Sequence, residues 1–160
     1  MMNIRTYEDR DKDQVGQLIV PIQSREFGIA IRLEDQPDLC AIPDFYQHGC
    51  GNFWVAEVDG EIVGSIALLD IGHQQAALRK MFVAQNFRGR EHGVAAKLLD
   101  SLLVSARNVG VREIFLGTTD KFLAAHRFYE KNGFVEIDRT QLPVAFPVMA
   151  IDSKFYRYMF

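Results

Sequence analysis

Apolar residues recur with strand-like spacing in the middle of the chain, where they predict an antiparallel meander. Three β-rich runs follow one another there with few residues between them. The runs are residues 53–58, 61–70 and 76–83. Asp59-Gly60 suits a two-residue type I′ turn between the first two runs, and residues 72–75 form the second turn. Gly64, inside the second run, indicates either a bulge or a close approach of another segment.

Further along the chain, the apolar spacing changes to that of an amphipathic helix over residues 93–108. Its apolar stripe consists of Val94, Ala95, Leu98, Leu99, Leu102, Leu103 and Ala106. Gly110 ends this helix, because glycine readily adopts the left-handed conformation found after a helix. The pattern then predicts a strand, a helix and two more strands. These are residues 111–117, 122–131 (stopped by Asn132-Gly133), 134–138 and a last strand within 149–160. A helix that connects 76–83 to 111–117 requires a parallel pair, so the sheet is mixed.

The first fifty residues give a weaker pattern. Residues 2–6 form a short strand, and apolar residues at helical spacing follow it, with Asp11 or Asp13 available as the N-cap. Those apolar residues are Val15, Leu18, Ile19 and Ile22. Pro21 predicts an end or a kink in this helix. Residues 38–46 are read as a short helix interrupted by Pro43.

Composition restricts the class of protein. The 160 residues fit one domain, 1–160, and 48% hydrophobic with 24% charged residues is typical of globular proteins. The net charge, 18 − 21 = −3, disfavours a nucleic-acid binder. No apolar run approaches the roughly 18 residues of a membrane span. Residues 1–13 lack the apolar core of a secretory signal, so we expect a cytoplasmic protein.

Cysteines and histidines indicate no metal site. Cys40 and Cys50 have no metal-ligand spacing and are read as reduced thiols, although a disulfide between them stays open. The histidines show no paired ligand spacing either. They are His48, His73, His92 and His126.

Residues 87–95 join a strand to the long amphipathic helix and form a candidate anion site. A helix N-terminus exposes unpaired N–H groups and carries partial positive charge, so a phosphate can bind there. Gly89 and Gly93 allow close approach of the backbone, and Arg88 and Arg90 add positive charge. The loop contains neither GxGxxG nor a Walker sequence. An ordinary loop with solvated arginines explains these residues equally well.

Two motifs in this half of the chain resemble the GNAT superfamily of acyl-CoA N-acyltransferases. Arg90-Glu91-His92-Gly93-Val94-Ala95 matches the family's R/Q-x-x-G-x-G/A motif, and "AAHRFYEKNGF" is similar to its second motif. The order of elements also fits, and the resemblance is specific over residues 76–138. It implies the GNAT fold: a mixed, mostly antiparallel, twisted sheet flanked by helices.

The resemblance implies acetyl-CoA, or another acyl-CoA, as the cofactor. The expected pantetheine contacts are the backbones of Met81, Phe82 and Val83. The expected pyrophosphate contacts are the amides of Arg88, Gly89, Arg90, Glu91, His92, Gly93, Val94 and Ala95. Compared with the family loop Arg-Gly-x-Gly-x-Gly, Glu91-His92 looks like a two-residue insertion, so the motif can be anchored at Arg88 or at Arg90. Glu91 also adds a negative charge beside the anion site.

Tyr129 matches the tyrosine of the second motif, which in that family protonates the leaving CoA thiolate as a general acid. Without the resemblance, Tyr129 would be read as part of the buried face of a helix. Phe122 replaces an asparagine that touches the cofactor in many relatives. For the general base, Glu57, Asp70 and His73 are candidates, and none is selected.

The resulting hypothesis is an N-acetyltransferase that moves an acetyl group from acetyl-CoA to a primary amine by direct attack. The acceptor is a small molecule or a peptide, in a pocket built from residues 24–50 and 143–147. Acidic residues on that side favour a cationic acceptor: Glu34, Asp35, Asp38 and Asp44. A non-catalytic acyl-CoA sensor and an interaction protein that binds no CoA are the alternatives. The aromatic tail, residues 155–160, either packs at a homodimer seam or completes the core.

Overall fold

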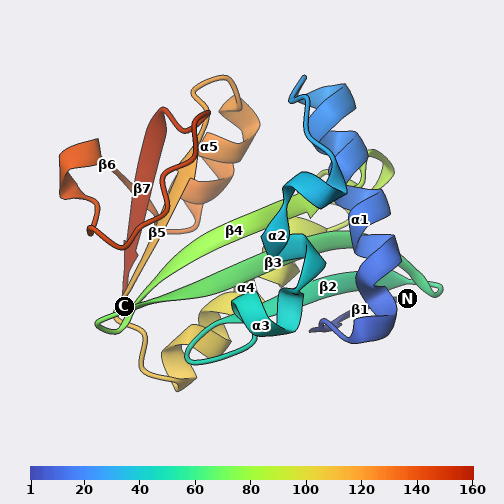
Figure 1. Cartoon of the computed structure of the whole chain (residues 1–160), viewed down its shortest axis with the longest axis horizontal. Helices are drawn as coiled ribbons and strands as arrows, with labels where there is room; N and C mark the ends of the chain where they lie inside the picture. Colours follow the sequence, from blue (N-terminus) through green and yellow to red (C-terminus); the bar gives the residue numbers. More distant parts are fainter.

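A seven-stranded sheet with the order β1-β2-β3-β4-β5-β7-β6 forms the centre of the molecule (Figure 1). The computed structural model describes all 160 residues. The strands are β1 (Met2–Thr6), β2 (Asn52–Val58), β3 (Glu61–Gly72), β4 (Gln75–Val83), β5 (Glu113–Thr118), β6 (Val135–Ile137) and β7 (Lys154–Met159). Only β4 and β5 are parallel, and every other neighbouring pair is antiparallel. The predicted mixed, mostly antiparallel sheet is therefore confirmed.

The predicted meander is formed by β2, β3 and β4. Asp59 and Gly60 both have positive φ, 50° and 81°, as a type I′ turn requires. Gly64 satisfies both readings of its position. The register of β2 against β3 shifts beside it, and a Cβ at Gly64 would lie 2.9 Å from Val94 Cγ1. The long helix therefore packs directly on the backbone of β3.

Helices cover both faces of this sheet (Figure 1). The helices α1 (Lys12–Pro21), α2 (Pro37–Cys40) and α3 (Ile42–Tyr46) lie in front of the sheet, and α4 (Val94–Asn108) lies behind it. The fifth helix is α5 (Leu123–Lys131). The apolar stripe predicted from the sequence places Val94, Leu98, Leu99, Leu102 and Ala106 in the core beneath α4. None of these helices is long and apolar enough to cross a membrane.

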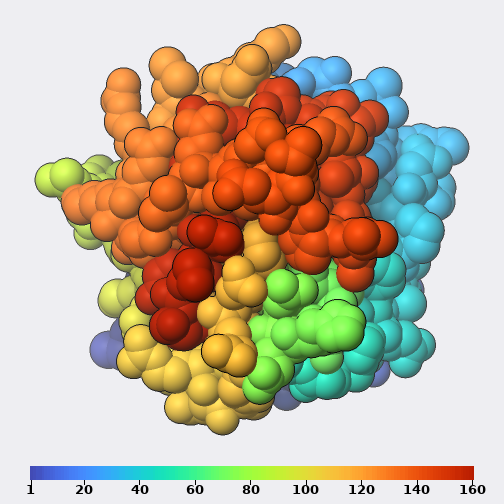
Figure 2. Space-filling view, turned by 90° about the vertical axis from the view of Figure 1, so that its left-hand side faces the viewer, coloured from blue at the N-terminus to red at the C-terminus, as the bar shows by residue number.

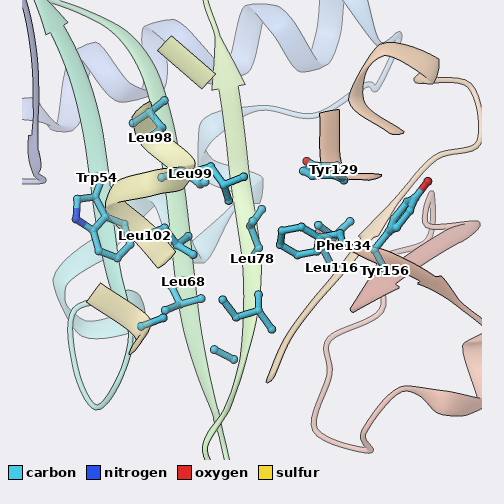
Figure 3. Packing of buried hydrophobic residues seen from close by; sticks show 14 of the residues in the cluster. Trp54, Leu68, Leu78, Leu98, Leu99, Leu102, Leu116, Tyr129, Phe134 and Tyr156 are labelled. Atoms are coloured by element: carbon cyan, nitrogen blue, oxygen red, sulfur yellow. The ribbon is translucent and has the colours of Figure 1, made fainter. Parts of the chain in front are cut away.

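The buried residues form one cluster on each face and a smaller third cluster. The largest joins α4 to the sheet and to aromatic residues of the C-terminal segment (Figure 3). A second cluster packs α1 and α3 on the opposite face of β2 and β3. The third contains Phe115, Ile137, Phe146 and Phe155. The sheet is thus packed on both faces, and the cluster beneath α4 spans both of its halves.

The N-terminal helices differ from the prediction at both prolines. Pro21 does not end the first helix, because a π-helical segment, Ile22–Glu26, continues it directly. A π-helical turn is typical of functional sites, and this one reaches the cleft described below. Pro43 does not interrupt a helix either. The chain breaks at Ala41, and Pro43 lies in the first turn of α3, where its missing N–H costs nothing.

The parallel pair of β4 and β5 is short. It includes only Gln75–Ala77 of β4 and Glu113–Phe115 of β5. Beyond Ala77, β4 has no partner on this edge, while its other edge still pairs with β3 as far as Val83. The two strands therefore separate toward their carboxyl ends, as Figure 1 shows. This separation creates the space that the candidate site uses.

The C-terminal segment completes the sheet. Strand β7 lies between β5 and β6, and Phe155 and Tyr156 are buried, 4% and 0% exposed. Tyr158 packs against Phe134 and Phe160, with ring centroids 5.2 and 4.9 Å apart. Figure 2 shows the side of the molecule where this segment forms a continuous surface above α4 and the β3–β4 turn. The aromatic tail was expected either to pack at a homodimer seam or to complete the core. Phe155 and Tyr156 complete the core.

Candidate active site

A cleft of about 1050 Å³ opens where β4 and β5 separate. Its walls come from both faces of the sheet, so it passes between the two strands. On one side it is bounded by the start of α4 and by α5, and on the other by the π-helical segment with the residues that follow it and by the segment before β7. Eighteen of its 33 lining residues are hydrophobic, which is typical of a small-molecule site with a few polar anchors.

Most residues predicted to bind a cofactor line this cleft, but not all. Those that do are Met81, Phe82, Val83, Arg88, Gly89, Arg90, Gly93 and Ala95. Glu91, His92 and Val94 are not in the lining. Val94 is 1% exposed and packs beneath the sheet, whereas the Glu91 side chain is 76% exposed, with its carboxylate against Gly89. Glu91 and His92 thus extend outward from the loop, so their side chains are not part of the cleft wall.

The start of α4 has the properties of an anion site. Gly93 is its N-cap in the left-handed conformation, with φ of 66°, and no side chain caps the helix. The first amides of α4 therefore have no partner within the helix or from a cap. A Cβ at Gly93 would have open space around it, so the backbone is accessible from the cleft. These features fit a phosphate group.

Arg88 does not supply a free positive charge, contrary to the expectation from sequence. Its guanidinium binds both carboxylate oxygens of Glu26, at 2.6 and 3.0 Å, and its Nε donates to the Val83 carbonyl at 2.9 Å. This bidentate pair ties the π-helical segment to the loop across the cleft. Arg90 forms no ion pair and remains available to an anion in the cleft.

Tyr129 lies along the cleft with its hydroxyl toward β4 (Figure 3). The side chain is 8% exposed, and the only hydrogen-bond partner of its hydroxyl is Met81 Sδ at 3.9 Å. Burial raises the pKa of Tyr129 to about 12. The phenol is therefore protonated at neutral pH, with its proton not committed to a strong acceptor.

A bulge distorts β4 at the centre of the cleft. Lys80 has a positive φ of 52°, which is uncommon for a residue with a side chain, and the β3–β4 register shifts here. Ser65, fully buried on β3, donates from its hydroxyl to the Lys80 carbonyl at 2.7 Å. This hydrogen bond stabilises the bulge. In a regular strand Arg79 and Lys80 would point to opposite faces of the sheet, and the bulge turns both to the same face.

Lys80 is held by a buried polar network that the sequence did not reveal. Its Nζ lies 2.9 Å from Gln36 Oε1 and 3.4 Å from Asp38 Oδ2. Tyr46 donates to the same Asp38 oxygen at 2.6 Å, and Gln36 pairs with Gln23 through both side-chain amides. Burial lowers the pKa of Lys80, and the Asp38 charge opposes that shift. The network joins α2 and α3 to the bulge.

Replacing Asp38 with alanine is expected to destabilise the protein by about 3–5 kcal/mol, because Lys80 and the Tyr46 hydroxyl would lose a buried partner. Urea unfolding measures this loss. Asp44→Ala is the control, since Asp44 is exposed and should change stability by less than about 0.5 kcal/mol. A loss below about 1 kcal/mol for Asp38→Ala would show that the network is not a structural support.

The acceptor side of the cleft differs partly from the prediction. Residues 24–50 contribute Phe27 and Ile29, as expected. The C-terminal loop contributes Ile151 and Asp152 rather than residues 143–147. The four acidic residues that favoured a cationic acceptor do not line the cleft. Asp38 is neutralised by Lys80, and both Glu34 and Asp35 lie near Arg32.

The three candidate bases also lie away from the cleft. Glu57 accepts from Arg5 at 3.1 Å, and Asp70 accepts from the amides of Cys50 and Gly72 at 3.1 and 2.8 Å. Those backbone bonds lower the pKa of Asp70. His73 is exposed in the β3–β4 turn. The structure therefore assigns all three side chains to structural or solvent-exposed positions.

Neither cysteine takes part in the site. Cys40 and Cys50 are free, and burial raises the pKa of Cys50 to about 11, so its thiol is protonated at neutral pH. No group of three His, Cys, Asp or Glu side chains is placed to hold a metal ion.

Phe122 and Phe27 close one end of the cleft. Their rings stack at 4.1 Å between centroids, and Phe82 lies 6.2 Å from Phe27. Phe122 thus supplies an apolar contact at the position where it replaces an asparagine of many relatives. The partners are far apart in the sequence, so the pattern alone could not show this contact.

The separated strands, the β4 bulge and the exposed start of α4 together define the acyl-CoA N-acyltransferase fold. The chain belongs to the acetyltransferase (GNAT) family, whose model matches residues 17–134. This family uses acetyl-CoA, so the predicted fold and cofactor are both supported.

Similar proteins extend over different parts of the chain. An acetyltransferase of the GNAT family from Staphylococcus aureus Mu50 is 38% identical, with a TM-score of 0.93 over 99% of both chains. The N-acetylaspartate synthetase of Xenopus tropicalis is 36% identical over 104 residues, which are 62% of this chain and 37% of that protein. The PaiA N-acetyltransferase of Thermoplasma acidophilum, crystallised with coenzyme A, shares the fold at 15% identity and a TM-score of 0.75, covering 100% of this chain and 99% of that one. The chain spans less than half the length of the curated relatives it matches first.

Proposed function

We propose that this protein is an acetyl-CoA-dependent N-acetyltransferase that acetylates a primary amine of a small-molecule or peptide acceptor. The observation that carries the proposal is the cleft itself, which brings an uncapped helix N-terminus and a buried, protonated tyrosine to one open strand edge. The names of the relatives, N-acetylaspartate synthetase among them, support an amine acceptor.

The residues along the cleft fit acetyl-CoA as a substrate. Amides between Arg88 and Ala95 that have no backbone partner, above all those at the start of α4, bind the pyrophosphate, and Arg90 adds positive charge. The edge of β4 from Met81 to Val83 offers backbone groups to the pantetheine arm, because β5 no longer pairs with it.

Strands from both ends of the chain enter one sheet, which supports residues 1–160 as a single domain.

The reaction follows from this arrangement. The acceptor nitrogen forms a bond to the thioester carbonyl carbon, a backbone amide near Met81 polarises that carbonyl, and the carbon–sulfur bond breaks. Tyr129 donates its proton to the departing thiolate and regains one from solvent. The amine proton leaves through a base on the acceptor side. No covalent enzyme intermediate is needed.

Calorimetric titration with acetyl-CoA tests the cofactor half of this proposal. We expect saturable binding to one site, with weaker binding of adenosine diphosphate, which lacks the pantetheine arm. Dephospho-CoA separates the contribution of the 3′-phosphate. Absence of binding at millimolar acetyl-CoA would overturn the proposed function.

A further inference from the structure

Two opposite charges face the acceptor side of the cleft, and the protein does not pair them. Arg79 extends from β4, and Asp152 comes from the segment that precedes β7. Neither takes part in an ion pair. The nearest polar contact of the Arg79 guanidinium is Met149 Sδ at 3.7 Å, and Asp152 accepts only the Met149 N–H, at 2.9 Å. Lys80, next to Arg79, is already neutralised by Asp38.

Neutral contacts hold both charged groups in place. The Arg79 guanidinium lies 5.8 Å from the centroid of the Phe45 ring. Met149 contacts Arg79 through its sulfur and Asp152 through its backbone, so one residue places the two charges on the same side of the sheet. They remain too far apart to form a salt bridge and close enough for their charges to interact.

Gly117 makes room for the carboxylate. A Cβ at this position would lie 2.6 Å from Asp152 Oδ2, so Asp152 rests directly on the backbone of β5. This point lies just beyond Phe115, the last residue of β5 that pairs with β4. The carboxylate therefore sits where the two strands separate, and its Oδ1 has no protein partner. Burial raises the pKa of Asp152, which favours its use as a proton acceptor.

A separated cation and anion in one cleft are complementary to a ligand that carries both charges. Arginine binds a carboxylate through two parallel hydrogen bonds, a geometry that an amine alone cannot use. We propose that the acceptor is a free amino acid, whose carboxylate binds Arg79 and whose amine binds Asp152. This inference rests on the proposed function and names its substrate class.

Asp152 then has a chemical role. The bound ammonium group first loses one proton to Asp152 Oδ1, which passes it to solvent, because only a neutral nitrogen has the electron pair needed for attack. Once the nitrogen–carbon bond forms, the nitrogen carries a second surplus proton. Asp152 Oδ1 accepts that proton and passes it to solvent, and Tyr129 supplies the proton that the thiolate gains. Apolar residues form the neighbouring wall and favour an apolar side chain on the acceptor: Ile22, Phe27, Ile29, Phe82 and Ile151.

Matched acceptors test the inference. L-phenylalanine, L-phenylalaninamide and phenethylamine share one side chain, and only the first has a carboxylate beside its amine. L-leucine, L-leucinamide and isopentylamine form a second set. Release of the CoA thiol from acetyl-CoA is measured for each, and the other L-α-amino acids are then compared with their amides. We expect at least one amino acid to exceed its own analogues in kcat/KM by about tenfold or more.

Two variants separate the roles of the charged groups. Arg79→Gln is expected to raise the KM for the amino acid about tenfold or more and to leave the KM for the carboxylate-free amine unchanged. Asp152→Asn is expected to lower kcat for every acceptor by about 100-fold, within the range for general base catalysis, with acetyl-CoA affinity unchanged. Arg112→Gln is the control, because Arg112 is exposed and outside the cleft lining, and it should behave as the wild type.

Three results would overturn the inference while leaving the proposed function intact. The first is that no amino acid exceeds its own amide or simple amine in kcat/KM. The second is an equal effect of Arg79→Gln on acceptors with and without a carboxylate. The third is an enzyme that binds acetyl-CoA but neither acetylates any amino acid nor binds one in calorimetry of the CoA complex. Failure of the wild type to bind acetyl-CoA would instead overturn the proposed function.

Discussion

Replacing Gly93 with aspartate is expected to weaken acetyl-CoA binding by at least about 100-fold, which corresponds to about 2.7 kcal/mol. Gly93 caps α4 with φ of 66°, and the amides that follow it have no cap. A carboxylate there would repel the pyrophosphate. Two unit charges about 4 Å apart near a protein surface interact by about 4 kcal/mol, so repulsion alone can produce the loss. Calorimetry with acetyl-CoA measures it.

Gly93→Asn distinguishes the effect of the negative charge from the effect of adding a side chain. Asparagine has nearly the same shape as aspartate and tolerates the left-handed conformation equally well. A Cβ at position 93 meets no other atom within 4 Å, so both variants should fold. We expect Gly93→Asn to lose no more than about tenfold in affinity, since it places no charge beside the phosphates. Wild-type affinity in Gly93→Asp would show that the pyrophosphate does not bind at the start of α4.

Replacing Tyr129 with phenylalanine is expected to lower kcat by about 10²–10⁴-fold while the KM for acetyl-CoA changes little. The ring packs against Phe134 and Tyr156 and should stay in place. The hydroxyl makes only one weak hydrogen bond, to Met81 Sδ at 3.9 Å, so its removal costs little stability. A thiolate leaving group with a reference pKa near 8.5 would then depart without a proton donor. Thiol release under saturating acceptor measures kcat.

Tyr156→Phe is the matched control for this variant. Tyr156 belongs to the same cluster, but its hydroxyl donates to Glu130 Oε2 at 2.7 Å and, unlike that of Tyr129, points away from β4 (Figure 3). Loss of that hydrogen bond should cost about 1–3 kcal/mol in stability with kcat close to wild type. If Tyr129→Phe keeps wild-type kcat, another group protonates the thiolate.

Much of the fold could be predicted because local signals determine it. The Asp59-Gly60 turn fixes the β2–β3 hairpin, and the apolar stripe from Val94 to Ala106 fixes both the helix and its buried face. Glycines at 110 and 133 follow the ends of α4 and α5 with positive φ, as expected. In each case the residues that determine the structure lie within a few positions of one another.

The acceptor half of the site could not be predicted, because its contacts join segments that are distant in the sequence. Arg88 appears free in the loop sequence, but Glu26, 62 positions away, binds it. Asp152 has no local motif, and its position depends on the missing Cβ at Gly117. Arg79 and Lys80 are visible in the sequence as two cations inside an apolar strand, which is an unusual place for charged residues. The bulge that turns both to one side depends on Ser65.

The most direct test of acetyl transfer is a time course with the wild-type protein, acetyl-CoA and a panel of primary amines, in which free thiol and acetylated amine are both measured. We predict catalytic turnover with one N-acetylated product molecule formed for each thiol released. Saturable acetyl-CoA binding without thiol release above the background of hydrolysis, for every amine, would contradict the account and indicate a protein that binds acyl-CoA without transferring its acyl group.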